Sequence, residues 1–135
     1  MDSPKILVVE DDPGIWELLG RQLRSAGYET VYAFDAVTAV KVARDERPDL
    51  IVLDIGLPGG DGFVIMERLR ALPALCAVPV IVLSARVEEP HPTRALELGA
   101  AAFLGKPYKR EQLIELIDAA MLHLRPHPAL ANLER

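Results

Sequence analysis

Residues 6–12 read ILVVEDD, an apolar run of four residues that ends in three consecutive acids. Residues 50–54 read LIVLD, the same kind of run with one acid at its end. Short, continuous runs rich in β-branched residues are typical of strands that are buried on both faces of a parallel sheet. Three further runs complete the pattern, so strands are predicted at residues 6–9, 28–33, 50–53, 80–83 and 101–104.

A helix-length segment follows each of these runs. Asp12, Asp35 and Asp61 are typical helix-capping residues, and Gly27 and Gly99 are typical helix stops. Helices are predicted from residue 13 to the stop at 27, from the cap at 35 to 46, and at residues 62–71, 93–98 and 109–124. The prolines at positions 90 and 92 predict a late start and a short fourth helix, because proline is tolerated only in a first turn.

Five strand–helix units in 135 residues predict one open, doubly wound α/β sheet, because parallel crossovers must be right-handed. We expect the flavodoxin-like strand order 2-1-3-4-5, with five helices distributed over both faces. This order places the second strand at an edge, which suits the polar Glu29 and Thr30 within it. Residues 1–124 form the expected domain, and residues 125–135 are expected to be a tail or the start of a linker.

The composition excludes several classes of protein. The apolar runs are too short to span a bilayer, and a single cysteine, Cys76, excludes an internal disulfide and a cysteine-based zinc site. With a formal charge of −5, the chain lacks the excess of basic residues that binding to nucleic acid or to an anionic membrane requires. The first residues also lack the pattern of a secretory signal. We therefore expect a cytoplasmic protein that binds neither nucleic acid nor a membrane.

Acidic residues gather where the predicted sheet would hold its functional crevice. That crevice lies at the carboxyl ends of the first and third strands, where the strand order reverses. Glu10, Asp11 and Asp12 follow the first strand, and Asp54 follows the third. Grouped carboxylates repel one another, and a hard cation such as Mg²⁺ offsets that cost. We therefore expect a magnesium site at this edge, although Asp12 alone is more simply explained as a helix cap.

Two further polar residues fall on the same rim. Ser84 ends the fourth strand and Lys106 follows the fifth, although each alone is more simply a strand-end hydroxyl or a solvated lysine. Together with a metal cation, a hydroxyl and an ammonium would compensate the charge of a phosphoryl group among carboxylates. An Asp carboxylate can accept such a group as a nucleophile and form an acyl phosphate.

Four segments, each at the carboxyl end of a predicted strand, carry a resemblance to a known family: residues 6–12, 53–62, 83–85 and 105–108. With these motifs in this order, the chain resembles the receiver domain of two-component response regulators over residues 4–124. The resemblance implies a phosphorylation-dependent signalling switch, not an enzyme with an external substrate. It implies a histidine kinase or histidine phosphotransfer protein as donor, an output domain or downstream protein as target, and it allows a phosphorylation-dependent dimer.

The resemblance also implies the metal and acceptor roles. Asp54 would be the phosphoacceptor, and Mg²⁺ would be held by Glu10, Asp11, Asp54 and the backbone carbonyl of Gly56. Gly56 stands where many relatives carry a larger side chain that influences access of water to the acyl phosphate. We therefore expect an altered rate of dephosphorylation.

The remaining implied roles concern the response to phosphorylation. Ser84 would be the switch hydroxyl, and Lys106 would bind the phosphoryl group, with a cis peptide bond before Pro107. Phe103 falls where the family places a rotating aromatic residue, although a plain core phenylalanine explains it equally well. Movement of Ser84 and Phe103 would reshape the face formed by the fourth helix, fifth strand and fifth helix.

Other functions stay open from the residues alone. A receiver-like interaction module could work without phosphorylation, although every expected polar residue is present. A Mg²⁺-dependent aspartyl-phosphate phosphohydrolase is less consistent, because Asp54 follows the third strand and the chain leaves no room for a cap insertion. A flavodoxin-like nucleotide carrier is disfavoured because the acids at 10–12 would repel a phosphate.

Overall fold

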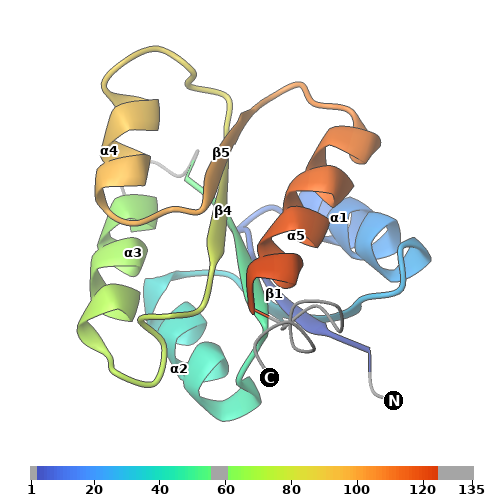
Figure 1. Ribbon diagram of the computed structural model, residues 1–135, viewed down its shortest axis with the longest axis horizontal. Coiled ribbons are helices and arrows are strands. Elements are labelled where there is room, and N and C mark those ends of the chain that lie inside the picture. Colours follow the sequence, from blue (N-terminus) through green and yellow to red (C-terminus); the bar gives the residue numbers. More distant parts are fainter. Residues whose placement is uncertain (1–2, 56–60, 125–135) are drawn as a thin grey trace, which may run out of the picture.

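The computed structural model of the protein describes residues 3–55 and 61–124. Its five strands are parallel and lie in the order β2-β1-β3-β4-β5 (Figure 1). They are β1 (Lys5–Val9), β2 (Glu29–Ala33), β3 (Leu50–Asp54), β4 (Val80–Ser84) and β5 (Ala102–Gly105). Each strand boundary lies within one residue of its prediction, and the predicted strand order is confirmed.

Helices cover both faces of the sheet, as predicted. They are α1 (Pro13–Ser25), α2 (Ala36–Glu46), α3 (Asp61–Ala71), α4 (His91–Glu97) and α5 (Arg110–Leu124). Helices α1 and α5 pack against one face, and α2, α3 and α4 pack against the other (Figure 1). No helix within residues 3–55 and 61–124 is long and apolar enough to cross a membrane.

The strands owe their continuous apolar runs to burial on both sides. In β1, Leu7 belongs to the hydrophobic cluster beneath α2 to α4, and Val8 belongs to the cluster beneath α1 and α5. Ile51 and Val52 of β3 divide between the two clusters in the same way, and all four side chains are fully buried. Because successive side chains of a strand point to opposite faces, consecutive positions in the middle of such a strand are apolar.

Strand β2 forms one edge of the sheet and is the most polar strand, with Glu29 exposed. The half-buried Trp16 of α1 covers part of this edge. Its ring centroid lies 4.8 Å from that of Tyr32 and 5.7 Å from that of Phe34. Aromatic packing thus closes an edge that polar residues otherwise leave open to solvent.

Side chains fix the ends of the helices. An Asp12 carboxylate oxygen accepts a hydrogen bond from the Gly14 amide at 2.8 Å, and Asp35 accepts one from the Thr38 amide at 2.7 Å. Both predicted caps are confirmed, and the bonds to Thr38 hold the pKa of Asp35 below its usual value. Arg47 follows the last residue of α2, and its left-handed backbone (φ 48°) costs a residue with a side chain roughly 1–2 kcal/mol.

The start of the fourth helix was predicted two residues too late. Helix α4 begins at His91 instead of Thr93, because Pro92 falls in its first turn, where no backbone N–H is needed from it. The Arg94 amide donates to the Pro90 carbonyl at 2.8 Å and closes that turn. At seven residues the helix is nevertheless short, as predicted. Asp61, predicted to cap the third helix, is instead its first residue.

Candidate functional site

Two carboxylates are buried next to each other at the carboxyl ends of β1 and β3. The two strands pair with Val9 opposite Leu53, so Glu10 and Asp54 are the next residues along the two neighbouring strands. Glu10 is 2% exposed and Asp54 is 3% exposed, whereas Asp11 is exposed at the rim. The topology therefore brings together the acids that the sequence places after different strands.

The environment of Glu10 disfavours its negative charge. Burial is the largest cause, and the neighbouring Asp54 carboxylate adds to it, so the pKa of Glu10 rises to about 8. The Asp12 amide donates to Oε1 of Glu10 at 3.1 Å and partly opposes this rise. The other oxygen, Oε2, is buried and receives no hydrogen bond from the residues that the structure describes. A buried carboxylate oxygen without a donor, beside a second carboxylate, fits a hard divalent cation such as Mg²⁺.

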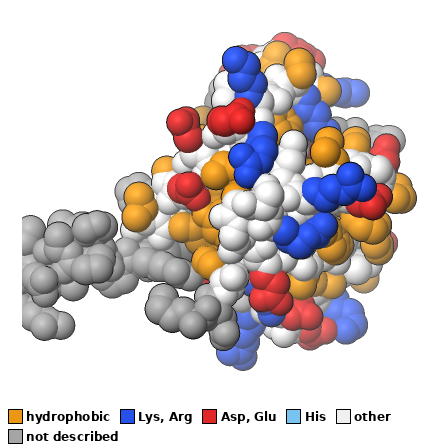
Figure 2. All heavy atoms as spheres, turned by 90° about the vertical axis from the view of Figure 1, so that its right-hand side faces the viewer, with side chains coloured by type: hydrophobic (Ala, Val, Ile, Leu, Met, Phe, Trp, Pro, Cys, Tyr) orange, Lys and Arg blue, Asp and Glu red, His pale blue; other side chains and the backbone are white. Residues whose placement is uncertain are grey.

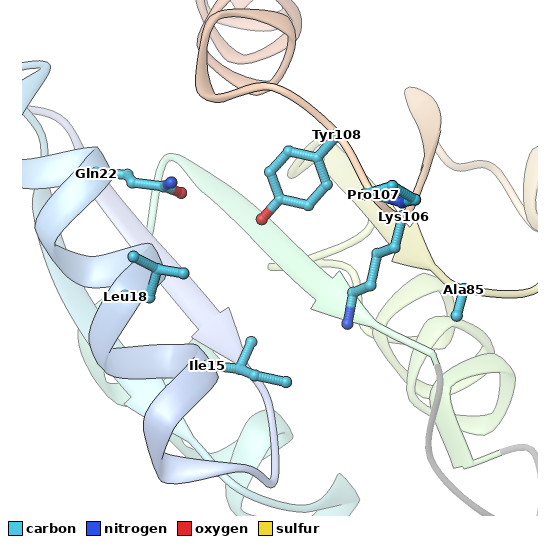
Figure 3. Close-up of a pocket in the computed structure, with 7 residues that line it drawn as sticks. All are labelled: Ile15, Leu18, Gln22, Ala85, Lys106, Pro107 and Tyr108. Atoms are coloured by element: carbon cyan, nitrogen blue, oxygen red, sulfur yellow. The ribbon is translucent and has the colours of Figure 1, made fainter.

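Lys106 brings the compensating positive charge to this pair. It follows β5, and its amide donates to the Ser84 carbonyl at 2.8 Å, which fixes the start of its loop against β4. From there its side chain extends toward the end of β3 (Figure 3), where Nζ donates to Oδ2 of Asp54. The Lys106 side chain is 25% exposed, so the ammonium closes the buried acids off from solvent only in part. The peptide bond between Lys106 and Pro107 is cis, as the resemblance implies.

Ser84 occupies the neighbouring strand end. Its side chain is buried at 1% exposure, and its hydroxyl oxygen accepts a hydrogen bond from the Arg86 amide at 2.9 Å. Strand pairing sets Asp54 opposite Leu83, one residue before Ser84. A buried hydroxyl thus lies on the strand next to that of Asp54, within the rim that the sequence predicts.

Phe103 lies further from the rim than the other candidates. It pairs with Val82 in the sheet, and its half-buried side chain packs against the cluster beneath α2, α3 and α4. This position is compatible both with a core residue and with one that responds to movement of α4. The remaining candidate, Gly56, lies outside the described residues.

A hollow of about 500 Å³ adjoins the site between α1 and the loop after β5 (Figure 3). Its lining residues are mostly apolar: Ile15, Leu18, Gln22, Ala85, Lys106, Pro107 and Tyr108. Burial, then the charges of Asp54 and Glu10, raise the pKa of Tyr108 to about 12. Oε1 of Gln22 is buried there with no hydrogen-bond donor in the described part of the chain.

The sequence reasoning assigned no role to Tyr108 or Gln22. Tyr108 belongs to the segment 105–108, so its place in that motif was a usable signal. Gln22 carried no such signal, because an isolated glutamine within an amphipathic helix is ordinary. Only the approach of α1 to the loop after β5 brings these two residues to one hollow.

Comparison with known proteins agrees with this geometry. Residues 6–118 match the family described as the response regulator receiver domain. The transcriptional regulatory protein PrrA of Mycobacterium tuberculosis is 40% identical over 119 residues, which cover 88% of this chain and 50% of PrrA. The phosphate regulon transcriptional regulatory protein PhoB of Escherichia coli is 38% identical over 122 residues, which cover 90% of this chain and 53% of PhoB. The chain thus spans about half the length of these relatives.

Solved structures show the same fold. The signal receiver domain of a signal transduction histidine kinase from Syntrophus aciditrophicus has a TM-score of 0.83 at 32% identity, covering 93% of this chain and 95% of that one. The BeF3-activated N-terminal receiver domain of Klebsiella pneumoniae RstA has a TM-score of 0.80 at 29% identity, covering 87% and 98%. Because the family match spans residues 6–118 and the strand order agrees, the chain belongs to the response regulator receiver domains of two-component systems.

Proposed function

We propose that this receiver domain is a phosphorylation-dependent switch in which Asp54 accepts a phosphoryl group from a histidine kinase or phosphotransfer protein. The contact between Lys106 and the buried Asp54, beside the buried Glu10, is the observation that carries the proposal. Two buried acids with one lysine between them and solvent lower the stability of the fold, because desolvation of the charges costs more than the ion pair returns. This arrangement becomes useful when Asp54 gains a dianionic group.

The transfer requires positioning and neutralisation of charge, with little further covalent chemistry. A carboxylate oxygen of Asp54 forms a bond to phosphorus, while the bond from phosphorus to the donor's imidazole nitrogen breaks. That nitrogen keeps the bonding electron pair, and the imidazole leaves as a neutral group when its other ring nitrogen carries a proton. Asp54 attacks as a carboxylate and therefore loses no proton. The Lys106 ammonium then pairs with a phosphoryl oxygen, and the Ser84 hydroxyl can donate to another.

Glu10, Asp11 and Asp54 are the described residues that would hold Mg²⁺, with the carbonyl of Gly56 as a further proposed ligand outside the described residues. The bound ion supplies neutralisation of charge on the phosphoryl oxygens. Only the ionised form of Glu10 is a good ligand for a hard cation, so this carboxyl must lose its proton as the ion binds. The acid cluster and its orphaned oxygen support this assignment.

Phosphorylation would change the partners of Ser84. Its hydroxyl oxygen now accepts from the Arg86 amide, at the start of the loop that leads to α4. Donation to a phosphoryl oxygen would draw this loop toward Asp54, and Phe103 would rotate into the space that Ser84 leaves. The face formed by α4, β5 and α5 would then present a different surface to an output domain or downstream protein.

The hollow beside Lys106 supports a protein donor. A phosphohistidine must approach Asp54 from the solvent side of the rim, and this hollow is an apolar surface that adjoins the lysine (Figure 3). The half-exposed Leu18 and the nearby Ile15 offer apolar contact for a helix that carries the histidine.

We place this exchange in the cytoplasm, and the protein turns over no external substrate.

Intact-protein mass after incubation with acetyl phosphate tests the proposal. The expected result is one phosphoryl adduct that requires Mg²⁺, disappears in Asp54→Asn, and persists in Asp45→Asn, which alters an exposed carboxylate on α2. Beryllofluoride, a stable mimic of the acyl phosphate, serves as the control for rapid hydrolysis. A folded protein that binds neither reagent would contradict the proposal and favour a module that works without phosphorylation.

A further inference from the structure

Three arginines on α2 and α3 have no acidic partner within the described residues. Arg44, Arg47 and Arg68 are exposed and make no ion pair or side-chain hydrogen bond there. Helices α2 and α3 are neighbours on one face of the sheet (Figure 1), and these residues will be named the α2–α3 arginine surface. A chain with a formal charge of −5 thus concentrates unbalanced positive charge at one place.

Three acids on the same two helices are already engaged with other cations. Asp45 pairs with Lys41 at 2.8 Å, and Glu67 pairs with Arg94 of α4 at 3.4 Å. Glu46 at the end of α2 pairs with Lys5 of β1 at 3.0 Å. The arginines are therefore unpaired although acids lie close to them in sequence.

Two adjoining hollows give this surface an apolar floor. One, of about 400 Å³, is lined by Val37, Val40, Lys41, Arg44, Asp45 and Arg68. The other, of about 300 Å³, is lined by Arg44, Arg47, Pro48, Ala74, Leu75 and Val78. Arg44 lines both hollows, so they adjoin each other at this residue. Val37 at its margin is 73% exposed and adds apolar area to this surface.

Arg47 is held in a backbone conformation that a side chain disfavours. Its φ of 48° is the only positive value among the non-glycine residues that the structure describes. Glycine is the usual residue at such a helix end, because it adopts this conformation without steric cost. The position therefore carries a guanidinium where local structure favours glycine, which points to a use for the charge.

We infer that the α2–α3 arginine surface docks an acidic, amphipathic segment of another protein. Carboxylates of such a segment would pair with the three guanidinium groups, and its apolar side chains would enter the two hollows. Charge complementarity selects an acidic partner. The apolar floor selects a polypeptide over nucleic acid, whose backbone offers charge without apolar side chains.

Amide NMR spectra of the full chain, titrated with synthetic peptides, test this inference. The probe is a helical peptide with leucines at every third and fourth position and glutamates between them. A second peptide replaces leucine with serine, and a third replaces glutamate with lysine. We expect the first peptide alone to shift amides within residues 37–48 and 68–78, with an affinity that falls as salt is added.

Single substitutions separate this surface from general electrostatics. Arg44→Gln and Arg68→Gln should each weaken binding about threefold, as loss of one exposed ion pair does. Arg47→Gly should weaken it similarly while raising the thermal unfolding midpoint, whereas Arg47→Lys should retain affinity. Arg21→Gln removes an exposed arginine from α1, across the sheet, and should change nothing.

Several results would overturn the inference. These are equal binding of the serine peptide, shifts centred on the hollow beside Lys106, indifference to all three arginines, or no shifts at saturating peptide. A DNA duplex that binds the same arginines more tightly would also overturn it. The titration repeated on Asp54→Asn should give the same affinity, so failure here and failure of the phosphorylation proposal are distinguishable.

Discussion

Asp54 and Glu10 are buried together, and the Lys106 ammonium forms an ion pair with Asp54. Mutual repulsion and desolvation both act against this arrangement, and the ammonium offsets them only in part. Such a cluster is poised to gain a cation and a phosphoryl group that complete its charge balance.

Lys106→Met should slow formation of the phosphoryl adduct on the order of a hundredfold, because one preorganised charge on the developing phosphoryl oxygens is lost. The measurement is the rate of adduct formation by intact mass at fixed acetyl phosphate and Mg²⁺. Lys109→Met, three residues further and exposed, is the matched control and should keep the original rate. An equal rate in Lys106→Met would remove this lysine from the proposed site.

Tyr108 should report the charge of the site through its own ionisation. Its pKa of about 12 lies above the ordinary value of 10, so the folded chain keeps the phenolic proton longer than the unfolded chain. This contribution to stability is complete below pH 10 and is lost as the pH rises toward 12.

Absorbance titration of tyrosinate should show an ionisation step near pH 12, and Tyr108→Phe should remove that step. Asp54→Asn should lower the pKa of Tyr108 without returning it to 10, because burial is the larger cause. A step near pH 12 that survives in Tyr108→Phe would assign it to another tyrosine.

At the scale of elements, Arg70 joins segments that are distant in sequence. This half-buried residue of α3 donates to the carbonyls of Leu98 at 3.2 Å, of Gly99 and of Cys76. It thereby holds the end of α4 and the loop before β4 against α3. We expect this contact to keep α4 in place while the other end of that helix responds to Ser84.

Arg70→Met should lower the free energy of unfolding by about 1–3 kcal/mol, as loss of hydrogen bonds to a charged group does. Hydrogen exchange should increase at residues 98–101, where the bonded carbonyls lie. Arg68→Met, on the same helix but exposed and unpaired in the described part of the chain, should stay within about 0.5 kcal/mol. Unchanged exchange at 98–101 would show that Arg70 does not fasten this loop.

The elements also show what sequence reasoning could and could not predict. Strand ends were predicted to within one residue because continuous apolar runs mark the strands directly. The start of α4 was predicted two residues too late, because proline is excluded from a helix interior but is tolerated in the first turn. Arg70 was not predicted at all, because its partners are backbone carbonyls, which no side-chain pattern reveals, and two of them lie 28 and 29 residues away.

For the whole molecule, stability rests on a sheet buried on both faces. Ile51→Ala should cost about 2–5 kcal/mol, because it leaves a cavity at a fully buried position of the central strand β3. Val37→Ala, at a 73% exposed position, should cost far less. Denaturant unfolding measures both, and similar losses for the two variants would contradict the described burial.

The same architecture explains why the candidate site was predictable. Parallel strands in the order 2-1-3-4-5 bring the carboxyl ends of β1 and β3 together, so acids 44 positions apart had to meet once the topology was known. The hollow beside Lys106 was not predictable, because it depends on how closely α1 approaches the loop after β5. That distance is set by packing of many side chains, which no local motif encodes.

The central claim is that Asp54 itself carries the phosphoryl group, and localisation of the modification tests it most directly. After reaction with acetyl phosphate and Mg²⁺, borohydride reduces an aspartyl phosphate to homoserine with release of phosphate, and peptide mass mapping finds the altered residue. Our account predicts homoserine at position 54 and nowhere else. Reduction at Glu10, Asp11 or Asp12, or a phosphoryl adduct that leaves residue 54 unaltered, would contradict it.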